Sequence, residues 1–557
     1  MTPLDWTVIA GYFALLVGIV WWSSKKQDNT EDYFLAGRDI GWFAVGASLF
    51  ASNIGSEHIV GLAGGGALNG MAQAHYELHA WIMILLAWVF VPFYYRAGVF
   101  TMPEFLEKRF NARTRWVLSI VSIVAYVFTK VSVTVYAGAL VFQALLPDTF
   151  GSPENAFWVG AFTTVTLTGV YTVFGGLRAV VYTEVAQTAL LLLGSVFITY
   201  FGLSLLGGWG ELQAIVAASE QNFSLWRPNS DPDFPWLGIM IASPVVGIWY
   251  WCTDQYIVQR TLSAKSLKDA RRGAIFGGFL KVWPVFIFLV PGMIGFALMQ
   301  KGMLAIPTDP ESGRVLGDMV FPTMVAELLP VGLRGLVVGG LLSALMSSLA
   351  SLFNSCATLF TIDIYEKIRP GRSQKHLVKV GRMATGVVVG FGLLWIPIMK
   401  VISEGNAGLY DYLQNVQGFL APPITAVFLL GLFHKRINEQ GAFWGLIIGF
   451  VIGMFKLTVQ TLTQSGVLTS GVLFAIGDFN GYYFAGVLFL ISIILIIVIS
   501  YATPAQSEEQ LRGLTYGSVT DEQRAENRAS WGTAEVVGTV VVLGLVLGVY
   551  LYFSFWI

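Results

Sequence analysis

Long apolar runs separated by short polar segments dominate this sequence of 557 residues. A helix needs about 20 mainly apolar residues to cross the hydrocarbon core of a bilayer, and many runs reach that length. They do not alternate with the period of two that strands of membrane barrels show. The runs therefore predict an all-α polytopic membrane protein with about 14 transmembrane helices. The predicted spans are residues 6–24, 38–63, 75–98, 113–144, 156–174, 180–206, 236–257, 273–299, 333–362, 380–402, 409–434, 438–463, 479–503 and 533–556.

The low share of charged residues agrees with a lipid-facing exterior. Charged residues make up 12% of the chain, against roughly 25% in soluble proteins, so the lipid bilayer is its predicted surroundings. The formal net charge of −1 gives no indication of a nucleic-acid partner, and no obligatory protein partner is evident. The first residues, MTPLDW, lack the basic region of a cleavable signal peptide. Cys252 and Cys356 lie in apolar stretches and imply no disulfide framework.

The basic residues orient the spans. An even number of crossings puts both termini on one side, and the loops of that side then hold only Arg227, Lys301 and Arg314. The loops of the other side hold nearly all remaining Lys and Arg residues outside the spans. By the positive-inside rule, both termini are predicted to be extracytoplasmic in a multi-pass protein of the plasma (inner) membrane. The polar segment 504–531 is then a cytoplasmic loop, expected to be mobile, and residues 1–557 form a single transmembrane domain.

Two spans carry helix-weakening residues in their middle. The second span, GASLFASNIGSEHIVGLAGGG, places Asn53, Gly55 and His58 there, and the seventh, SPVVGIWYWCTDQ, contains Pro244 and Gly247. A glycine-rich packing face and an interfacial aromatic belt are the alternative interpretations. Interrupted helices in both spans would free backbone carbonyl oxygens inside the membrane.

Interrupted helices five spans apart are typical of inverted repeats. Each repeat would contain five helices, and this odd number makes the second repeat insert upside down. The interpretation places repeat one at 38–206 and repeat two at 236–434. Residues 6–24 and 438–556 are then accessory helices.

A stripe of hydroxyl groups follows one face of the ninth span, SALMSSLASLFNSCATLFTIDIY. Such hydroxyls often bond back to their own helix or join neighbouring helices, and this alternative stays open. Carbonyls freed in the second span would form an uncharged cage of oxygens together with Ser347 and Ser348. Uncharged oxygen ligands suit Na⁺ rather than a transition metal, so the pattern predicts a Na⁺ site.

Long polar side chains occur in or near other spans. Lys281 has apolar residues on both sides, and Glu77 and Gln414 lie near the outer ends of their spans. Polar side chains within a membrane usually face a cavity; snorkelling and solvated helix ends are the alternatives. The set that would suit a neutral, polyhydroxylated ligand is Asn53, His58, Glu77, Lys281 and Gln414, with aromatic faces at Tyr250 and Trp251. Three further ionisable residues lie in or near spans: Lys130, Glu184 and Lys456. They are interpreted as members of stabilising ion pairs, whose partners the sequence does not indicate.

Several phrases of the sequence are long and specific. They are TEDYFLAGRDIGWFAVGASLFASNIGSEHIVGLAG from Thr30, TMPEFLEKRF from Thr101, YWCTDQYIVQRTLSAK from Tyr250, SALMSSLASLFNSCATLFTIDIY from Ser343 and PPITAVFLLGLF from Pro422. In these phrases the chain resembles the sodium/solute symporter family, and within it the sodium/sugar cotransporters of the glucose/galactose type, over nearly its whole length. The resemblance implies two inverted five-helix repeats, similar to the leucine-transporter architecture. It also implies a secondary active symporter that couples inward Na⁺ movement to monosaccharide uptake by alternating access, without enzymatic activity or an organic cofactor.

The resemblance implies roles for particular residues. The family's sodium site uses backbone oxygens of the broken first repeat helix and serine hydroxyls of the eighth core helix. These positions fall on Ala51, Ile54, Ala344, Ser347 and Ser348. The substrate-site positions fall on Asn53, His58, Glu77, Lys281 and Gln414, with Tyr250 as the inner gate and Trp251 beside it. The outer-gate positions fall on Leu62, Tyr76 and Tyr410.

Some positions depart from known relatives. His58 stands where one bacterial relative has glutamine and animal members have histidine. A serine contact and an asparagine contact of relatives become Ala80 and Gly247, which leaves the identity of the sugar open. A second sodium site in some relatives needs an aspartate and a threonine. The corresponding residues here are Glu184 and Ala350, which favours one Na⁺ per cycle.

Other functions are alternatives at this point. The same fold could carry proline, iodide, a vitamin, myo-inositol or a sialic acid, although Glu77, Lys281 and Gln414 together favour a sugar or polyol. A membrane-embedded enzyme would have to use Glu57, His58 or Glu77, but the sequence has no HExxH and no nucleophile–base motif. A channel would repeat one pore element symmetrically, and this chain does not.

Overall fold

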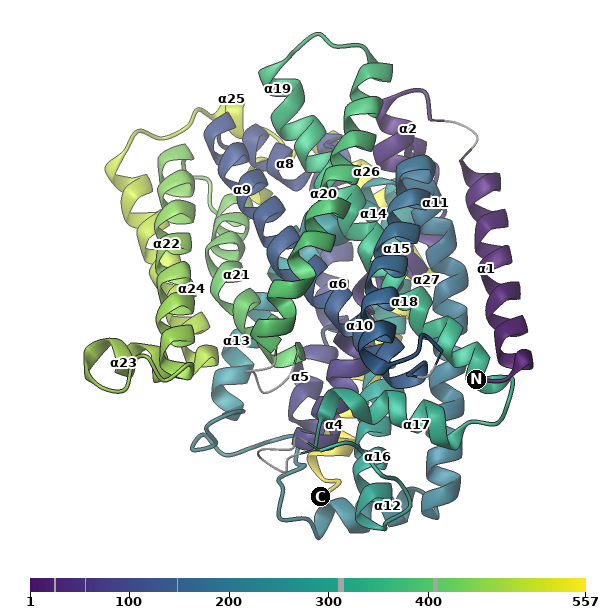
Figure 1. The fold of residues 1–557 in the computed structure, drawn as a ribbon. Coiled ribbons are helices and arrows are strands. Elements are labelled where there is room, and N and C mark those ends of the chain that lie inside the picture. The colour runs from purple at the N-terminus through teal and green to yellow at the C-terminus, as the bar shows by residue number, and fades with distance from the viewer. Residues whose placement is uncertain (25–26, 56, 148, 309–314, 404–408) are drawn as a thin grey trace.

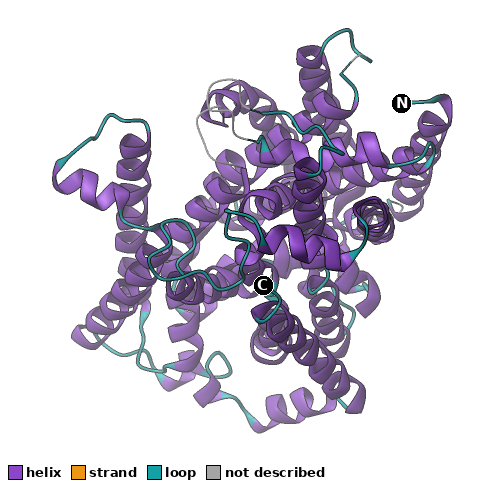
Figure 2. Cartoon of the chain, turned by 90° about the horizontal axis from the view of Figure 1, so that it is seen from below, coloured by secondary structure: helices purple, strands orange, loops and turns teal. Residues whose placement is uncertain are grey.

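The computed structural model describes residues 1–24, 27–55, 57–147, 149–308, 315–403 and 409–557, without the side chains of 57, 398–403 and 409–412. Over this part of the chain the structure is helical, with two isolated β-bridges and no strand (Figures 1 and 2). Twelve helices among the described residues are long and apolar enough to cross a membrane, which confirms the all-α polytopic class.

The α-helices follow one another along the chain as follows: α1 (Pro3–Ser23), α2 (Thr30–Leu35), α3 (Trp42–Asn53), α4 (Ala63–Asn69), α5 (Ala74–Glu77), α6 (Ala80–Leu85), α7 (Val91–Ala97), α8 (Met102–Arg109), α9 (Ala112–Ala125), α10 (Ser132–Leu145), α11 (Pro153–Leu206), α12 (Trp209–Ala217), α13 (Trp236–Ile248), α14 (Gln255–Leu262), α15 (Leu267–Lys281), α16 (Val290–Gln300), α17 (Val320–Leu328), α18 (Leu333–Thr358), α19 (Glu366–Ile368), α20 (Gln374–Ser403), α21 (Leu409–Phe433), α22 (Glu439–Gln464), α23 (Gly471–Asp478), α24 (Gly481–Ala502), α25 (Glu508–Leu511), α26 (Asp521–Ala529) and α27 (Thr533–Ser554). The π-helical segments that the site uses are Glu57–Leu62, Tyr126–Val131 and Trp249–Thr253.

α11 contains two of the predicted spans. It has 54 residues, which would extend about 80 Å in a straight helix, far beyond a hydrocarbon core of about 30 Å. Gly176 interrupts it with φ 55° and ψ −164°, a conformation that favours glycine. On either side of Gly176, Tyr171 donates to the carbonyl of Met346 at 2.9 Å and Glu184 accepts from Ser347 at 3.4 Å. The two halves of α11 therefore fold back on each other beside α18, and together they supply two membrane crossings.

The helical stretch His58–Ala97 also contains parts of two spans. The chain turns at Gly70, where φ is 62° and ψ is −136°. A Cβ atom on Gly70 would lie 2.4 Å from the Cα of Phe223, so this turn needs glycine both for its conformation and for the close approach. The segment before the turn completes the broken second span, and the segment after it forms the third. Counting both long helices as two passes gives 14 crossings among the described residues, which is the number predicted from the sequence.

Both predicted interruptions occur in the structure. α3 ends at Asn53, and the chain is extended at Ile54 before a π-helical turn begins. In the seventh span Pro244 lies inside α13, which continues through Trp249–Thr253, and the interruption falls at Asp254 with ψ 125°. The sequence signals thus marked the correct spans, but in the seventh span the break lies ten residues beyond the proline.

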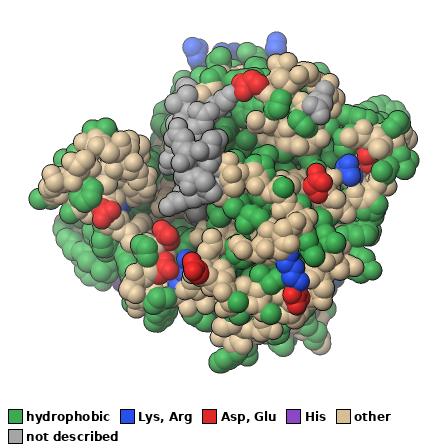
Figure 3. Space-filling model, turned by 60° about the horizontal axis from the view of Figure 1, so that its bottom comes forward, with side chains coloured by type: hydrophobic (Ala, Val, Ile, Leu, Met, Phe, Trp, Pro, Cys, Tyr) green, Lys and Arg blue, Asp and Glu red, His purple; other side chains and the backbone are tan. Residues whose placement is uncertain are grey.

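α18 is the central helix of the bundle and is buried along nearly its whole length. α1, α24 and α27 lie at the periphery and expose apolar side chains, as lipid-facing helices do. Figure 1 shows α22 and α24 as a pair on the left and α1 on the right, with both chain ends at the lower end of the bundle. Seen from that end, charged side chains are scattered among apolar and uncharged ones (Figure 3).

The polar segment 504–531 differs from the expected mobile loop. It contains α25 and α26 and lies at the upper end of Figure 1, opposite the chain termini. Arg271 donates to the side chain of Asn527 at 2.5 Å, Arg96 lies 3.5 Å from Glu526, and the ring of Tyr516 stacks on Phe433 with centroids 5.0 Å apart. The segment is therefore a strap that connects the ends of α7, α15 and α21.

Close helix packing generates a prediction at Gly292 of α16. A Cβ atom there would lie 1.9 Å from the carbonyl oxygen of Ala63 in α4, so Gly292→Ala must push these helices apart. Overpacking of this kind costs about 1–3 kcal/mol, and we expect a lower melting temperature of the purified protein. Gly544→Ala in α27 is the matched control, because no atom lies within 4 Å of the position that its new methyl group would take. Equal melting temperatures for the two variants would contradict this packing.

Candidate functional site

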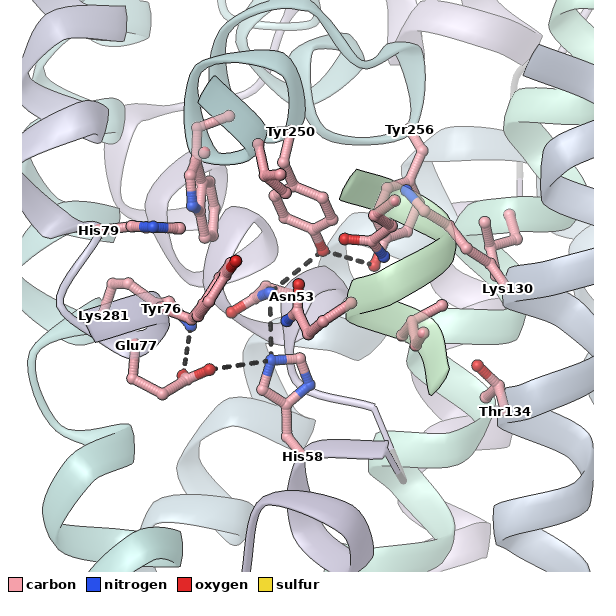
Figure 4. A pocket seen from close by; sticks show the side chains of 17 residues that line it. Asn53, His58, Tyr76, Glu77, His79, Lys130, Thr134, Tyr250, Tyr256 and Lys281 are labelled. Atoms are coloured by element: carbon pink, nitrogen blue, oxygen red, sulfur yellow. Dashed lines mark hydrogen bonds and ion pairs between the residues drawn. The ribbon is translucent and has the colours of Figure 1, made fainter. Parts of the chain in front are cut away.

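The two broken helices and the spans packed on them enclose a cavity (Figure 4). All seven substrate-site residues predicted from the sequence line it: Asn53, His58, Glu77, Tyr250, Trp251, Lys281 and Gln414. The remaining lining residues are Tyr76, His79, Lys130, Thr134, Val246, Gly247, Tyr256, Leu352, Leu413 and Gln417. Side chains from distant parts of the sequence thus face a single space inside the bundle.

A chain of polar contacts crosses this cavity. Lys281 Nζ donates to Glu77 Oε2 at 2.5 Å, and Glu77 Oε1 lies 3.6 Å from His58 Nε2. The same nitrogen of His58 lies 3.5 Å from Asn53 Nδ2, which donates to the hydroxyl of Tyr250 at 3.1 Å. Apart from the half-buried Tyr250, these side chains are buried. Short ion pairs and hydrogen bonds are strengthened at low dielectric, so the Lys281–Glu77 and Asn53–Tyr250 contacts hold these side chains in place, and His58 lies between the two pairs.

The cavity presents acceptors and aromatic faces to a ligand. Asn53 Oδ1 and Gln414 Oε1 are buried and have no hydrogen-bond partner among the described residues. A buried acceptor left unpaired costs about 1–3 kcal/mol, so both oxygens favour a ligand that carries donors. The rings of Tyr250 and Trp251 lie next to each other, with centroids 5.0 Å apart and planes at 77°. The arrangement suits a compact ring that bears hydroxyl groups.

One of the lining residues, Lys130, belongs to an ion pair that the sequence did not predict. Lys130 Nζ donates to Asp254 Oδ2 at 2.5 Å, and Asp254 is the residue at which the seventh span breaks. The aromatic rings with centroids between 4.5 and 5.1 Å from this ammonium are those of Tyr126, Trp249, Tyr250 and Tyr256. The available signals were a lysine within a span and an acid beside an interrupted helix, but nothing in the sequence indicates that the two meet.

The predicted sodium-site residues come together where the break after α3 meets α18. Ser347 Oγ donates to the carbonyl of Ala51 at 3.0 Å. Ser348 Oγ donates to the carbonyl of Ser52 at 3.3 Å. Ile54 follows α3 directly, and Ala344 precedes the serines by one turn; both are buried. These hydroxyl and carbonyl oxygens are the kind of uncharged ligand that a cation of low charge would take in place of the direct hydrogen bonds.

Another buried ion pair lies beside these serines. Glu184 Oε1 lies 3.4 Å from Arg260 Nη2, and both side chains are fully buried. The carboxylate also accepts hydrogen bonds from the hydroxyls of Ser48, Ser52, Ser347 and Ser351. The sequence analysis counted Arg260 among the basic residues of the loops, whereas the structure places it, buried, in the helix Gln255–Leu262. The chain resumes a helix after Asp254, which carries Arg260 back into the interior.

The predicted outer-gate residues are placed differently from one another. Tyr76 lines the cavity, and its ring centroid lies 5.7 Å from that of His79 and 6.0 Å from that of Tyr482. Leu62 is fully buried at the end of the π-helical segment 57–62 and is not part of the lining within the described residues. The side chain of Tyr410 lies outside the described residues.

Comparisons with known proteins assign the class that this fold and site define. The model of the sodium:solute symporter family matches residues 33–449, well over half of the chain, and the chain belongs to this family.

Sodium/glucose cotransporter 1 of Oryctolagus cuniculus is 41% identical over 530 residues, covering 90% of this chain and 79% of that protein. Sodium/myo-inositol cotransporter 2 of Homo sapiens is 37% identical over 551 residues, covering 93% of this chain and 79% of that protein. A solved structure of a Na⁺-coupled sialic acid symporter in its substrate-bound outward-open state has the same fold. It matches with a TM-score of 0.76 at 24% identity and covers 91% of this chain and 99% of that chain.

The Lys281–Glu77 pair generates a prediction about stability. Lys281→Met would leave the buried Glu77 carboxylate without its ammonium, and breaking one side of a buried pair costs about 3–5 kcal/mol. The double variant Lys281→Met/Glu77→Gln removes both charges, and we expect it to recover most of the loss. Melting temperatures of the purified variants measure both effects. A double variant as unstable as the single one would contradict a direct charge pair.

Proposed function

We propose that this protein is a secondary active symporter that couples inward movement of Na⁺ to uptake of a glucose- or galactose-like monosaccharide by alternating access. The observation that carries the proposal is the cavity, in which donors, acceptors and aromatic faces surround a space suited to a hydroxyl-bearing ring. Membership of the sodium:solute symporter family and 41% identity to a sodium/glucose cotransporter support the same reaction.

The charge balance of the cavity favours a neutral substrate. Lys281 pairs with Glu77 and Lys130 pairs with Asp254, each at 2.5 Å. A sialic acid, iodide or the carboxylate of proline would compete with a buried carboxylate for the same ammonium, whereas a sugar hydroxyl can bond to either group without displacing it. myo-Inositol is also neutral, and one relative is named for it. Competition of hexoses and myo-inositol for the uptake of one labelled hexose separates these substrates.

The charges beside the proposed ion site support one Na⁺ per cycle. The residues proposed to bind the ion are Ala51, Ile54, Ala344, Ser347 and Ser348. Glu184 is the adjacent carboxylate that could attract a further cation. It lies 3.4 Å from the guanidinium of Arg260 and accepts hydrogen bonds from several serine hydroxyls. A positive charge belonging to the protein already balances it. A neutral sugar and one Na⁺ would therefore move one charge inward per cycle.

The proposal includes an orientation in the plasma membrane with both termini extracytoplasmic. Both chain ends lie at the same end of the bundle (Figure 1), and the strap 504–531 lies at the opposite end with Arg96, Arg271 and Arg272. Clustered basic residues favour the cytoplasmic side.

The inverted repeats at 38–206 and 236–434 belong to the same proposal, because each begins with an interrupted helix.

Uptake into proteoliposomes tests the proposed reaction. We expect labelled hexose to accumulate only with an inward Na⁺ gradient, faster at an inside-negative potential, with one charge per sugar. A potential of 100 mV contributes about 2.3 kcal/mol per charge, and a tenfold Na⁺ gradient adds about 1.4 kcal/mol. Together they sustain a sugar gradient of roughly 500-fold. Uptake that ignores both Na⁺ and potential would exclude the proposal.

The two serines of α18 provide a test of the ion site. Ser347→Ala and Ser348→Ala each remove a candidate oxygen ligand, and a hydrogen bond or ligand to a charged group is worth about 1.5–3 kcal/mol. We expect the Na⁺ concentration for half-maximal uptake to rise at least about tenfold, with little change in the order of sugar preference. Ser343→Ala is the matched control on the same helix, since its hydroxyl bonds back to the carbonyl of Gly339. Unchanged Na⁺ activation in both test variants would place the ion elsewhere.

A further inference from the structure

His79 lines the cavity, although neither the sequence analysis nor the family resemblance assigns it a role. It directly precedes α6 and is buried. Figure 4 shows its ring at the edge of the cavity, on the same side as Tyr76 and Lys281. What this imidazole can bind depends on which of its two ring nitrogens donates a hydrogen bond and which one accepts.

The hydrogen bonds around His79 identify which nitrogen carries the proton. Ser243 Oγ lies 2.7 Å from His79 Nε2 and 3.0 Å from the backbone carbonyl of His75. A carbonyl only accepts, so the single O–H of Ser243 is directed to His75. Ser243 Oγ must then accept from His79, which places a proton on Nε2. In the neutral imidazole with this proton, Nδ1 is an acceptor.

The missing side chain at Gly247 leaves that acceptor accessible. A Cβ atom on Gly247 would lie 3.0 Å from His79 Nδ1, 2.9 Å from its Cε1 and 2.3 Å from Ile82 Cδ1. Gly247 itself lines the cavity. Within the described residues no hydrogen bond to Nδ1 is formed, so the lone pair lies at the cavity edge beside the space that any larger residue at 247 would fill.

We propose that His79 is a specificity-determining residue whose Nδ1 accepts a hydrogen bond from one hydroxyl group of the transported sugar. Ser243 is the positioning residue, because it fixes the tautomer and the ring orientation. Gly247 keeps the acceptor open. The inference rests on the proposed sugar transport and deepens it, since it selects sugars that carry a hydroxyl at the matching ring position.

A panel of monodeoxy hexoses tests the contact. Each analogue lacks one hydroxyl, and we expect one of them to compete about tenfold more weakly than hexose in the wild-type protein, because Nδ1 then stays unpaired. His79→Ala should weaken competition by hexose about tenfold but should leave the affinity for that one analogue nearly unchanged. His79→Asn offers an amide oxygen near the place of Nδ1 and should restore part of the discrimination.

Two further variants keep the test independent of folding. Gly247→Ala should reproduce the selective loss for the same hydroxyl, because its methyl group covers the Nδ1 edge. His75→Asn is the control, a buried histidine one turn away whose ring nitrogens face Tyr550 and the carbonyl of Leu225 and do not face the sugar. It should leave the order of the deoxy sugars unchanged.

The failure of this inference differs from a failure of the proposed function. A wild-type protein without Na⁺-driven hexose uptake would refute the transport of sugars altogether. If the wild type transports hexose but His79→Ala and Gly247→Ala weaken every deoxy sugar by the same factor, His79 has only a structural role and the inference is overturned.

Discussion

The structure depends on how backbone groups are paired where a helix breaks inside the membrane. No water is available in hydrocarbon, so a break persists only where other parts of the protein supply donors. After α3 these donors are the hydroxyls of Ser347 and Tyr256, which reach the carbonyls of Ala51 and Ser52. At the other break, the hydroxyl of Tyr94 donates to the carbonyl of Cys252 at 2.7 Å. The break thus releases the backbone carbonyl oxygens proposed to bind Na⁺ from hydrogen bonds within their own helix.

Buried charges follow the same constraint. Three ion pairs cross between helices near the cavity: Lys281–Glu77, Lys130–Asp254 and Arg260–Glu184. Pairs of this kind contribute little net stability against an apolar alternative, yet losing one partner is expensive. They therefore determine which helices face each other more than they strengthen the fold. Among the described residues that line the cavity, Lys281, Glu77 and Lys130 are thus each paired with an opposite charge, which favours a neutral ligand.

Local patterns predicted the helices and the breaks well, and contacts between distant residues poorly. Apolar runs give spans because length and composition alone decide whether a helix crosses a bilayer. The turn at Gly176 lies between the predicted spans 156–174 and 180–206, which the lengths of the apolar runs had already separated. In the seventh span, by contrast, the break lies at Asp254 and not at Pro244. The strap 504–531 looked like a mobile loop because its anchors, such as Arg271, lie far away in the sequence.

The sequence by itself determined the membrane class, the interrupted spans and seven of the side chains that line the cavity. Intramembrane polar residues are few, and the cost of burying them concentrates them around a shared space. Only the tertiary structure decided their partners. Glu77 and Lys281 are 204 residues apart, and Arg260 turned inward to reach Glu184 instead of lying in a loop. The open acceptor of His79 depends on the hydrogen bonds of Ser243 and on the space left by Gly247. Hydrogen bonds and ion pairs act over a few ångströms, so they form only after packing has fixed which helices are neighbours.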